Sequence, residues 1–445
     1  MTRTPSPSSR PADPRAPRPA DPRVIVLDLL EAVLGHKKLL DEVLDSDQRL
    51  PKLSERDRGF ARLLVATTLR RLGQLDTLVD RCLERPLPAK AVRVRNMLRI
   101  GAAQLLILQT PPHAAISTTV DLAKNSSLAG FSKLINAVLR RLDREGRAWM
   151  AEQDAAQLNT PAWLWESWLQ AYGVETATAI AGAHLLEAPV DITVAGDPAL
   201  WAERLQAEIM PTGTLRRFGG GDITQLPGFA EGAWWVQDLA ASLPAKLMGP
   251  VKGKRVADLC AAPGGKALQL AVAGADVTAV DRSAKRMIRF RRNLERLKLA
   301  ATIVETDVAG WTPPAPFDAV LLDAPCTATG TFRRHPDGPH QKGPGDVAYL
   351  ADQQHMLLKA AADMLKPGGI LVYCVCSLEP QEGEGQIDRL LASGVTLVRD
   401  PITAAEVPGL EQVLTAQGEI RTLPHYLGDK GGMDAFFIAR LRRPA

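Results

Sequence analysis

Two cysteines stand where a thiol could act as a nucleophile. Cys326 ends the run DAPC and Cys376 lies in the run CVCS, and each run closes an apolar segment typical of a buried strand. Upstream, the run DLCAAPGGK at residues 258–266 is typical of a strand that turns into a helix beside a nucleotide-like cofactor. Thiols combined with such a turn favour methyl transfer to a pyrimidine, because carbon 5 of cytosine becomes nucleophilic only after a thiolate adds at carbon 6.

Charged side chains near the cysteines are candidates for supporting roles in this chemistry. A free thiol is mostly protonated at neutral pH, so a neighbouring cation must favour the thiolate, and Lys266 is the candidate. Asp323 could hydrogen-bond N3 and the amino group of the base. One cysteine must attack, and the second could then assist release of the product. For each thiol alone, a buried structural cysteine is the competing interpretation.

Acidic residues at the ends of predicted strands indicate which cofactor the turn would hold. Asp281 lies 23 residues after Asp258, near the spacing at which an acidic residue binds ribose hydroxyls in such folds. Asp307 ends the next strand and could reach an adenine edge, although each aspartate could instead cap a helix. The turn is neither a dinucleotide fingerprint nor a phosphate-binding P-loop, so S-adenosylmethionine fits better than NAD or ATP.

Short apolar runs alternate with helical patterns from about residue 253 onward. Strands buried on both faces have this continuous apolar character, which predicts a mostly parallel, doubly wound sheet with helices on each side. We therefore expect a Rossmann-like α/β domain over residues 236–445, with its ligands at the carboxyl ends of the strands. The predicted strands are residues 255–259, 277–280, 302–304, 319–322 and 370–375.

The front third of the chain has a different character. Apolar residues recur at helical spacing over residues 24–147, which predicts an all-α domain. Residues 1–23 are rich in Pro, Arg and Ser, and we expect a disordered basic tail there. Residues 1–150 hold 26 Lys and Arg against 16 Asp and Glu, while the remainder holds 28 against 34. This asymmetry favours a polyanionic partner, although a solvated helix surface would show the same excess.

Residues 150–235 predict a small α+β connecting subdomain between these two domains. Three of its tryptophans fall in one short predicted helix, and such spacing is more typical of a core than of base stacking. They are Trp163, Trp165 and Trp168. No site is expected there, and Asp238 in the run WWVQDLAAS is interpreted as a helix cap at the entry to the last domain.

The composition bounds the remaining possibilities. With 445 residues the chain is long enough for two or three domains, and no segment approaches the roughly 18 consecutive apolar residues of a membrane span. No apolar core follows the basic start, so we expect no secretory signal, no membrane association and a cytoplasmic location. Five cysteines without paired CxxC knuckles argue against a disulfide framework and a structural zinc, and we expect no metal.

Several of these runs resemble known families. PHAAISTTVDLAK at residues 112–124, with INAVLRR at 135–141, resembles the RNA-binding domain of the NusB antitermination factor. DLCAAPGGK, VDRSAKR, LLDAPCTATGTFRRHPD and CSLEPQEGE resemble the RNA cytosine-5 methyltransferases. Over about residues 24–443 the whole arrangement is similar to the ribosomal small-subunit methyltransferase B family. The resemblance implies an S-adenosylmethionine-dependent enzyme, expected to be monomeric, that makes 5-methylcytosine in small-subunit (16S) ribosomal RNA positioned by the NusB-like domain.

The same resemblance implies a role for each site residue. Cys376 would be the nucleophile, Cys326 would assist release of the methylated RNA, and Cys374 would be a bystander. Asp323 would serve both the cofactor and the base. The residues implied in binding S-adenosylmethionine are Cys260, Ala261, Ala262, Pro263, Gly264, Gly265, Lys266, Asp281, Asp307 and Asp323.

Three positions beside the chemistry depart from the family pattern. Thr327 and Ala328 replace the usual Ser-Gly after the DAPC cysteine, and Gly383 replaces the usual Asn of a Glu-Asn pair. These departures bear on fine positioning more than on activity, because both cysteines, Lys266 and Asp323 are present. Residues 434–437 (DAFF) stand where Asp-Gly-Phe-Phe is expected, in a predicted late antiparallel strand.

Other interpretations stay open at this point. The same chemistry could act on transfer RNA, and Cys326 rather than Cys376 as nucleophile would resemble the DNA cytosine-5 enzymes. A non-catalytic RNA-binding scaffold is a third possibility, against which the pair of cysteines argues. Arg333, Arg334 and His335 are interpreted as phosphate or backbone contacts, with a solvated basic loop as the alternative.

Overall fold

The computed structural model describes residues 21–445, which divide into two compact units. The first holds the described residues up to Leu69 together with Leu75–Met150, and the second holds Arg70–Gln74 and Ala151–Ala445. The predicted basic tail falls almost entirely outside the described residues. Within residues 21–445, no helix has the length and hydropathy that crossing a membrane would require, and no group of three or more His, Cys, Asp or Glu side chains could hold a metal ion.

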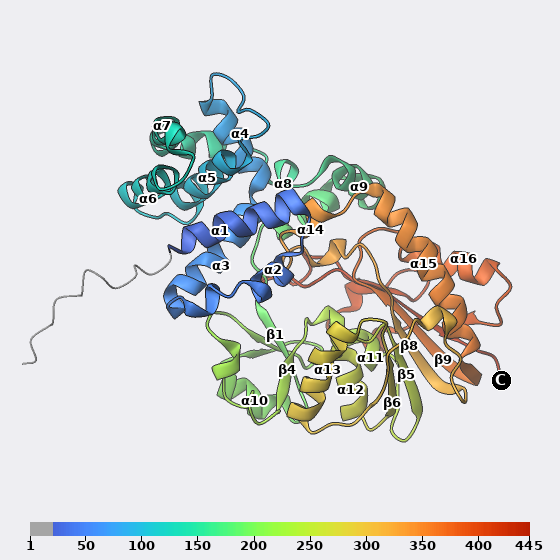
Figure 1. The fold of residues 1–445 in the computed structure, drawn as a ribbon. Coiled ribbons are helices and arrows are strands. Elements are labelled where there is room, and N and C mark those ends of the chain that lie inside the picture. Colours follow the sequence, from blue (N-terminus) through green and yellow to red (C-terminus); the bar gives the residue numbers. More distant parts are fainter. Residues whose placement is uncertain (1–20) are drawn as a thin grey trace, which may run out of the picture. The chain divides into compact units, whose positions relative to one another are not determined.

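The first unit is all-helical, as the sequence predicts (Figure 1). Its first helix begins at Pro22, two residues earlier than predicted. Asp21 accepts a hydrogen bond from the Arg23 amide there, and the proline presets the helical backbone. The helices are α1 (Pro22–Leu30), α2 (Leu40–Ser46), α3 (Glu55–Arg70), α4 (Leu72–Cys82), α5 (Val92–Ala102), α6 (Pro112–Lys124) and α7 (Ser132–Ala151).

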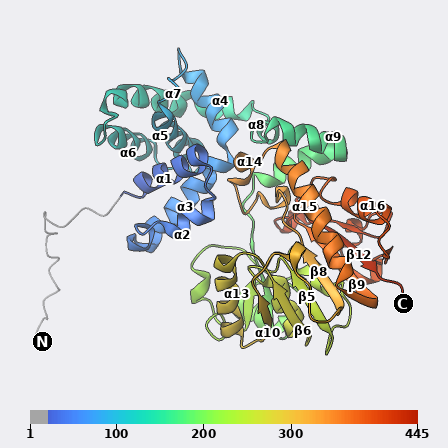
Figure 2. The ribbon, with the colours of Figure 1, turned by 45° about the vertical axis from the view of Figure 1, so that its right-hand side comes forward.

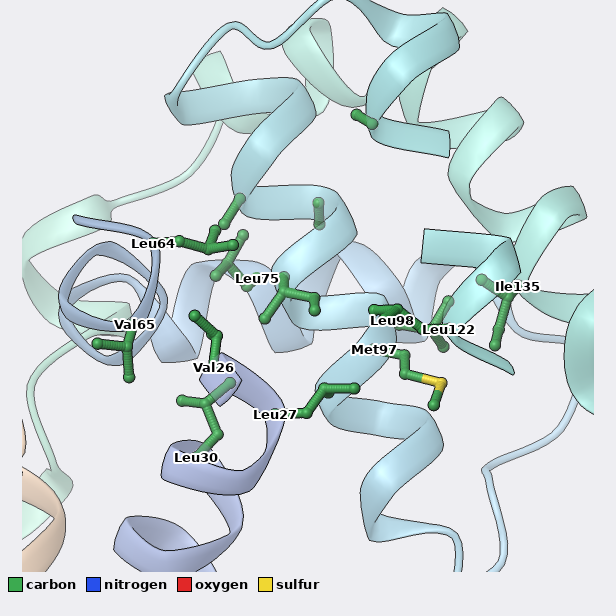
Figure 3. Packing of buried hydrophobic residues seen from close by; sticks show 14 of the residues in the cluster. Val26, Leu27, Leu30, Leu64, Val65, Leu75, Met97, Leu98, Leu122 and Ile135 are labelled. Atoms are coloured by element: carbon green, nitrogen blue, oxygen red, sulfur yellow. The ribbon is translucent and has the colours of Figure 1, made fainter. Parts of the chain in front are cut away.

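The core of this unit is a single cluster of apolar side chains, part of which is drawn in Figure 3. Leu27 of α1, Leu64 of α3, Leu98 of α5 and Ile135 of α7 are each no more than 1% exposed. Burying such a side chain contributes about 1.5–3 kcal/mol. The NusB-like run at residues 112–124 coincides with α6, and its buried residues belong to this core.

The second unit begins with a long helix and a small sheet. α9 (Ala162–His184) extends well beyond the short helix that the tryptophans predict, and its backbone leaves the helical region at Gly173. Trp168 is buried, as expected of a core residue, and its indole N–H donates to Glu379 at 3.1 Å. The small sheet has the order β2-β3-β1-β4, formed by β1 (Val190–Val194), β2 (Glu208–Ile209), β3 (Leu215–Arg217) and β4 (Trp234–Val236).

The larger sheet is mostly parallel, as predicted. Its order is β10-β12-β9-β8-β5-β6-β7, and β11 pairs with β12. Strands β5 to β9 pair in parallel, whereas β12 runs antiparallel to β9. This late antiparallel strand begins at Phe437, so Asp434 lies before it and not within it. The strands are β5 (Arg255–Leu259), β6 (Asp276–Val280), β7 (Thr302–Val304), β8 (Phe317–Asp323), β9 (Leu365–Val375), β10 (Val398–Arg399), β11 (Ile420–Arg421) and β12 (Phe437–Arg442).

Helices cover both faces of the larger sheet (Figure 1), and Figure 2 shows α13 and α15 on opposite sides of it. On one face lie α11 (Leu243–Lys246), α12 (Gly265–Val272) and α13 (Ala284–Leu297), where Phe290 shares a cluster with Val256 of β5. On the other face lie α15 (Pro344–Asp363) and α16 (Glu384–Ala392), where Leu358 shares a cluster with Val320 of β8. The predicted doubly wound, Rossmann-like architecture is confirmed, and the carboxyl ends of its parallel strands meet at one edge.

Candidate active site

The two candidate thiols meet at the carboxyl edge of the parallel strands. Asp323, the last residue of β8, pairs with Cys374 of β9, and both chains continue past this pair to Cys326 and Cys376. The sulfur atoms of Cys326 and Cys376 lie 3.5 Å apart. Both side chains are half-buried, and Cys376 lines a cavity of about 530 Å³. The fold therefore brings two thiols from separate strand ends together, and one of them lines the cavity.

Asp323 and Lys266 line the same cavity and pair with each other. The Lys266 ammonium donates to Oδ2 of Asp323 at 2.7 Å and lies 5.1 Å from the centre of the Phe436 ring. Burial is the largest single influence and disfavours the charged ammonium, but the charge and hydrogen bond of Asp323 together with the nearby Cys374 and Asp258 raise the pKa of Lys266. The cation expected beside a catalytic thiol is thus paired with a carboxylate.

The neighbouring thiols Cys326 and Cys374 are held in their protonated form. The contact with Cys376, followed by burial, raises the pKa of Cys326 well above its usual range. Burial, followed by the charge of Asp323, raises the pKa of Cys374, whose Sγ lies 3.5 Å from Oδ1 of that aspartate. A protonated Cys326 can donate its S–H toward the Cys376 sulfur.

The glycine-rich turn follows β5 and enters α12. Gly264 has a φ of 108°, and a Cβ there would collide with the Phe290 ring, so only glycine fits. The Ala262 amide donates to Oδ2 of Asp281 at 3.1 Å, which ties the turn to the end of β6. Cys260 lines a second cavity, whereas the large one is lined by Ala261, Pro263, Gly265 and Lys266. The turn therefore contributes to both cavities.

The second cavity, of about 110 Å³, is lined by Asp281, which directly follows β6, and by Asp307, which lies three residues after the end of β7 and not at its end as predicted. Asp281 also accepts from the Ser283 amide at 2.8 Å, and Asp307 accepts from the Ala309 amide at 3.0 Å, so both aspartates act as caps as well. The apolar part of the lining comes from Val308, Leu350, Met356 and Leu357. Carboxylates beside an apolar wall are the chemistry that ribose hydroxyls and an adenine ring require, so the lining of this cavity is compatible with an adenosine group.

Glu382 is a candidate that the sequence analysis did not assign. Its buried carboxylate accepts from the amide and hydroxyl of Thr327, with the amide at 3.0 Å, and from the hydroxyl of Ser377 at 2.5 Å. Gln354 donates to it at 3.0 Å, and burial raises the pKa of Glu382. Because Thr327 and Ser377 directly follow the paired thiols, one carboxylate ties both thiol-bearing segments together. An acid six residues after Cys376 was the available signal.

The three departures from the family pattern have local structural counterparts. Thr327 retains the hydroxyl that a serine would present to Glu382. Ala328 adopts a left-handed backbone with φ of 57°, a conformation that favours the glycine usual at this position. Space beside Gly383 is filled by the guanidinium of Arg421, with which a Cβ at residue 383 would collide.

The arginines after the DAPC run are not part of a solvated loop. Arg333 is 1% exposed and donates to Asp434 at 3.1 Å. Arg334 donates to Asp238 at 2.5 Å and to Asp434 at 3.0 Å, while Asp238 also caps the Ala240 amide, as expected. The interpretation of Arg333 as a phosphate contact is therefore wrong, because buried carboxylates already pair with it. Arg334 and His335 line the large cavity.

A glycine-rich turn shared by two cavities, at the carboxyl edge of a mostly parallel sheet, is the arrangement of Rossmann-like enzymes that bind a nucleotide-like cofactor. Residues 245–442 match the family model described as 16S rRNA methyltransferase RsmB/F. Residues 20–144 match the model of the NusB family. These two matches agree with the two units and with both predicted resemblances.

Curated relatives match nearly the whole chain. The ribosomal RNA small subunit methyltransferase B of Pseudomonas putida is 36% identical over 444 residues, which cover 95% of this chain and 98% of the relative. The protein of the same name from Xylella fastidiosa is 37% identical over 436 residues, covering 94% and 97%. The chain belongs to the RsmB/F family of 16S rRNA methyltransferases.

Two solved structures share parts of the fold. The crystal structure of PH0851 has a TM-score of 0.73 at 21% identity and covers 94% of this chain and 98% of its own. A methyltransferase homolog protein from Pyrococcus horikoshii has a TM-score of 0.53 at 28% identity and covers 62% of this chain and 93% of its own. The first similarity extends over both units of the fold.

Proposed function

We propose that this chain is an S-adenosylmethionine-dependent methyltransferase that modifies carbon 5 of a cytosine in 16S ribosomal RNA. The observation that carries the proposal is the pair of Cys326 and Cys376, with sulfurs 3.5 Å apart, beside a cavity that Asp323 also lines. The curated relatives named above are ribosomal RNA small subunit methyltransferases, which supports small-subunit RNA as the substrate.

Cys376 is the proposed nucleophile. It lines the cavity, and the raised pKa of Cys326 keeps that second thiol protonated, so that its S–H can hydrogen-bond the Cys376 sulfur. The Cys376 thiolate adds to carbon 6 of the cytosine, and carbon 5 then takes the methyl group from the cofactor, which would leave as the neutral thioether. Solvent takes the proton from carbon 5, the double bond between carbons 5 and 6 re-forms, and the bond from carbon 6 to the Cys376 sulfur breaks, with the S–H of Cys326 stabilising the departing thiolate. Asp323, oriented by Lys266, would accept hydrogen bonds from the amino group and the protonated N3 of the base.

The cofactor would supply the methyl group on a positively charged sulfur. Asp281 and Asp307 are proposed to hold its adenosine part in the smaller cavity, whose lining combines carboxylates with apolar side chains. The turn at residues 260–266 and Asp323 would hold the remainder, because this turn lines both cavities. Lys266 keeps Asp323 in place through its 2.7 Å hydrogen bond.

Further proposals concern how each domain takes part in binding the RNA and where the protein acts. Residues 24–147 would position the RNA, residues 150–235 would connect, and residues 236–445 would carry the chemistry. The target cytosine must leave any base stack to reach the cavity, at a cost of a few kcal/mol that an unpaired target lowers. We propose that the protein acts as a monomer in the cytoplasm and that the reaction requires no metal.

The test is methyl transfer from labelled S-adenosylmethionine to 16S ribosomal RNA and to transfer RNA. Cys376→Ala should transfer no label, whereas Cys326→Ala should accumulate a covalent protein–RNA adduct, because the methylated base is released slowly. Cys82→Ala, in the first unit, is the matched control and should behave as the wild type.

Each alternative has its own outcome in this assay. An adduct in Cys376→Ala and none in Cys326→Ala would exchange the two roles, as in the DNA-type enzymes. Label on transfer RNA alone would change the substrate. Normal methylation by both variants would refute thiol catalysis and favour a binding scaffold.

A further inference from the structure

A network of buried charges lies beside the large cavity. Three arginines and three aspartates form it, and none of their side chains is more than 22% exposed. Each aspartate lies within 4 Å of two of the arginines, so every charge in the network has a partner of opposite sign. The members of this charge network are Asp191, Arg216, Asp238, Arg333, Arg334 and Asp434.

Arg334 is the member that reaches all three aspartates. Its guanidinium donates to Asp238 at 2.5 Å and to Asp434 at 3.0 Å, and it lies 3.8 Å from Asp191. It also donates to the carbonyl oxygen of Pro189 at 3.0 Å. Asp191 lies in β1 and Pro189 directly precedes that strand, whereas Asp434 lies just before β12. One side chain thus connects the small sheet to the larger one.

Arg216 of β3 makes a second connection from the small sheet. It donates two hydrogen bonds of 2.7 Å to the carboxylate of Asp191. It also donates to the carbonyl oxygens of Lys430 and Gly432 at 2.9 and 2.6 Å. Because Gly432 lies two residues before Asp434, Arg216 fixes the segment from which that aspartate meets Arg334.

The segment that carries Arg334 also contacts the backbone of the proposed nucleophile. The Gly330 amide donates to the Cys376 carbonyl at 3.0 Å, and the Gly330 carbonyl accepts from the Ala435 amide at 3.0 Å. A Cβ at residue 330 would collide with the Ala435 carbonyl, so these segments are in close contact. Ala435 directly follows Asp434, and the ion pair between Arg334 and Asp434 therefore closes a ring of contacts beside the Cys376 backbone.

We propose that Arg334 is a positioning residue for methyl transfer, through which the small sheet holds the backbone at Cys376 and the segment after Cys326 in place. The inference rests on the proposed function, and it gives the small sheet, where no site was expected, a part in the reaction. Arg334 would act through the backbone of Gly330 and Ala435. A planar guanidinium suits this role, because its fixed fork sets the orientation of several acceptors at once.

The test uses Arg-to-Lys variants of the full chain, because removing a buried charge outright can unfold the protein. Arg334→Lys keeps the charge but loses the planar fork that reaches three acceptors. Arg216→Lys tests whether the small sheet takes part. Arg440→Lys is the matched control, since Arg440 is 11% exposed and pairs with both carboxylate oxygens of Glu406 but lines neither of the two cavities.

Three quantities are measured for each variant: kcat and KM for 16S ribosomal RNA, hydrogen exchange at the Gly330 amide, and the free energy of unfolding in urea. Arg334→Lys should lower kcat at least about tenfold and change KM less than about threefold, because displaced reacting groups slow the chemistry more than binding. Its Gly330 amide should exchange at least about tenfold faster. Arg216→Lys should change kcat and exchange in the same direction. Arg440→Lys should change neither beyond the effect of its own loss of stability.

A structural role alone would give a different pattern. Equal losses of kcat in Arg334→Lys and Arg440→Lys at similar stability, or unchanged exchange at Gly330 in Arg334→Lys, would overturn the proposal. Wild-type kcat and exchange in Arg216→Lys would overturn the part assigned to the small sheet. Hydrogen exchange does not depend on turnover, so absence of methyl transfer in the wild type would refute the proposed function and leave the exchange result intact.

Discussion

Replacing Gly383 with alanine should destabilise the second unit through Arg421. A Cβ at residue 383 would collide with the Arg421 guanidinium and lie 3.0 Å from Cγ of Phe437, so the guanidinium must move. In its present position Arg421 donates to the Ser377 carbonyl at 2.5 Å and to both carboxylate oxygens of Glu384, at 3.1 and 2.6 Å. The Ser377 carbonyl directly follows the proposed nucleophile in the chain.

The expected cost follows from these contacts. A hydrogen bond from a charged donor to a buried carbonyl contributes about 1.5–3 kcal/mol. The Glu384 side chain is 37% exposed, so its ion pair with Arg421 contributes less than about 1 kcal/mol. Displacing the guanidinium should therefore lower the free energy of unfolding by about 2–3 kcal/mol. Because the segment after Cys376 loses a support, turnover should fall more than RNA affinity does.

A double-mutant cycle with Arg421→Ala isolates the collision. Once the guanidinium is gone, Gly383→Ala should cost only what the contact with Phe437 adds, which leaves a coupling of about 2 kcal/mol between the two substitutions in urea unfolding. Gly310→Ala is the matched control, because a Cβ there meets no atom of residues 21–445 within 4 Å. Additivity within about 0.5 kcal/mol would refute the reasoning.

Three further substitutions test other parts of the site. Glu382→Ala should cost about 3 kcal/mol in urea unfolding and Glu382→Gln much less, because the hydroxyls of Thr327 and Ser377 can turn to meet an amide; equal losses would contradict this. Ala328→Gly should raise the free energy of unfolding by no more than about 1 kcal/mol, because the relief of a left-handed backbone is offset by the greater entropy of glycine in the unfolded chain. A clear fall in the free energy of unfolding would argue against a left-handed backbone at residue 328. Burial raises the pKa of Asp258, so the stability that the protonated carboxyl contributes is complete below the unfolded pKa of about 4 and is lost as pH rises through the folded pKa. The free energy of unfolding of Asp258→Asn relative to wild type should therefore increase with pH, and a difference that stays constant with pH would be contrary evidence.

The elements that the sequence predicts well are those with local signals. Continuous apolar runs located β5 and β7 with the bounds that the structure has. The meeting of Cys326 and Cys376 followed from one topological rule, because the ends of adjacent parallel strands share an edge. The amino-terminal part of β9 was missed because Gly368 and Gly369 interrupt its apolar pattern.

Contacts between distant residues could not be predicted in this way. The burial of Arg333 could not be predicted from the sequence, because its partner Asp434 lies 101 residues later in the chain. The pairing of Lys266 with Asp323 likewise depends on how α12 packs beside β8. The role of Glu382 could not be predicted either, because its carboxylate contacts both thiol-bearing segments, which only the folded chain brings together. Local pattern therefore predicted which residue types line the site, while the partner of each charge came from tertiary packing.

Successive side chains of β9 point to opposite faces of the sheet, so the length of this strand decides which face its last residues occupy. Cys374 and Cys376 belong to one face of the sheet, and Val375 between them belongs to the other. This register is fixed by six paired positions with β12 on one side and by the pairing with β8 on the other. Between Ile370 and Cys374, where the pairing with β8 is regular, inserting or deleting a single residue would turn the thiol to the opposite face. Over evolutionary time the surrounding helices can lengthen by any number of residues, but this regular part of the strand can change only by an even number if the thiol is to keep facing the cavity.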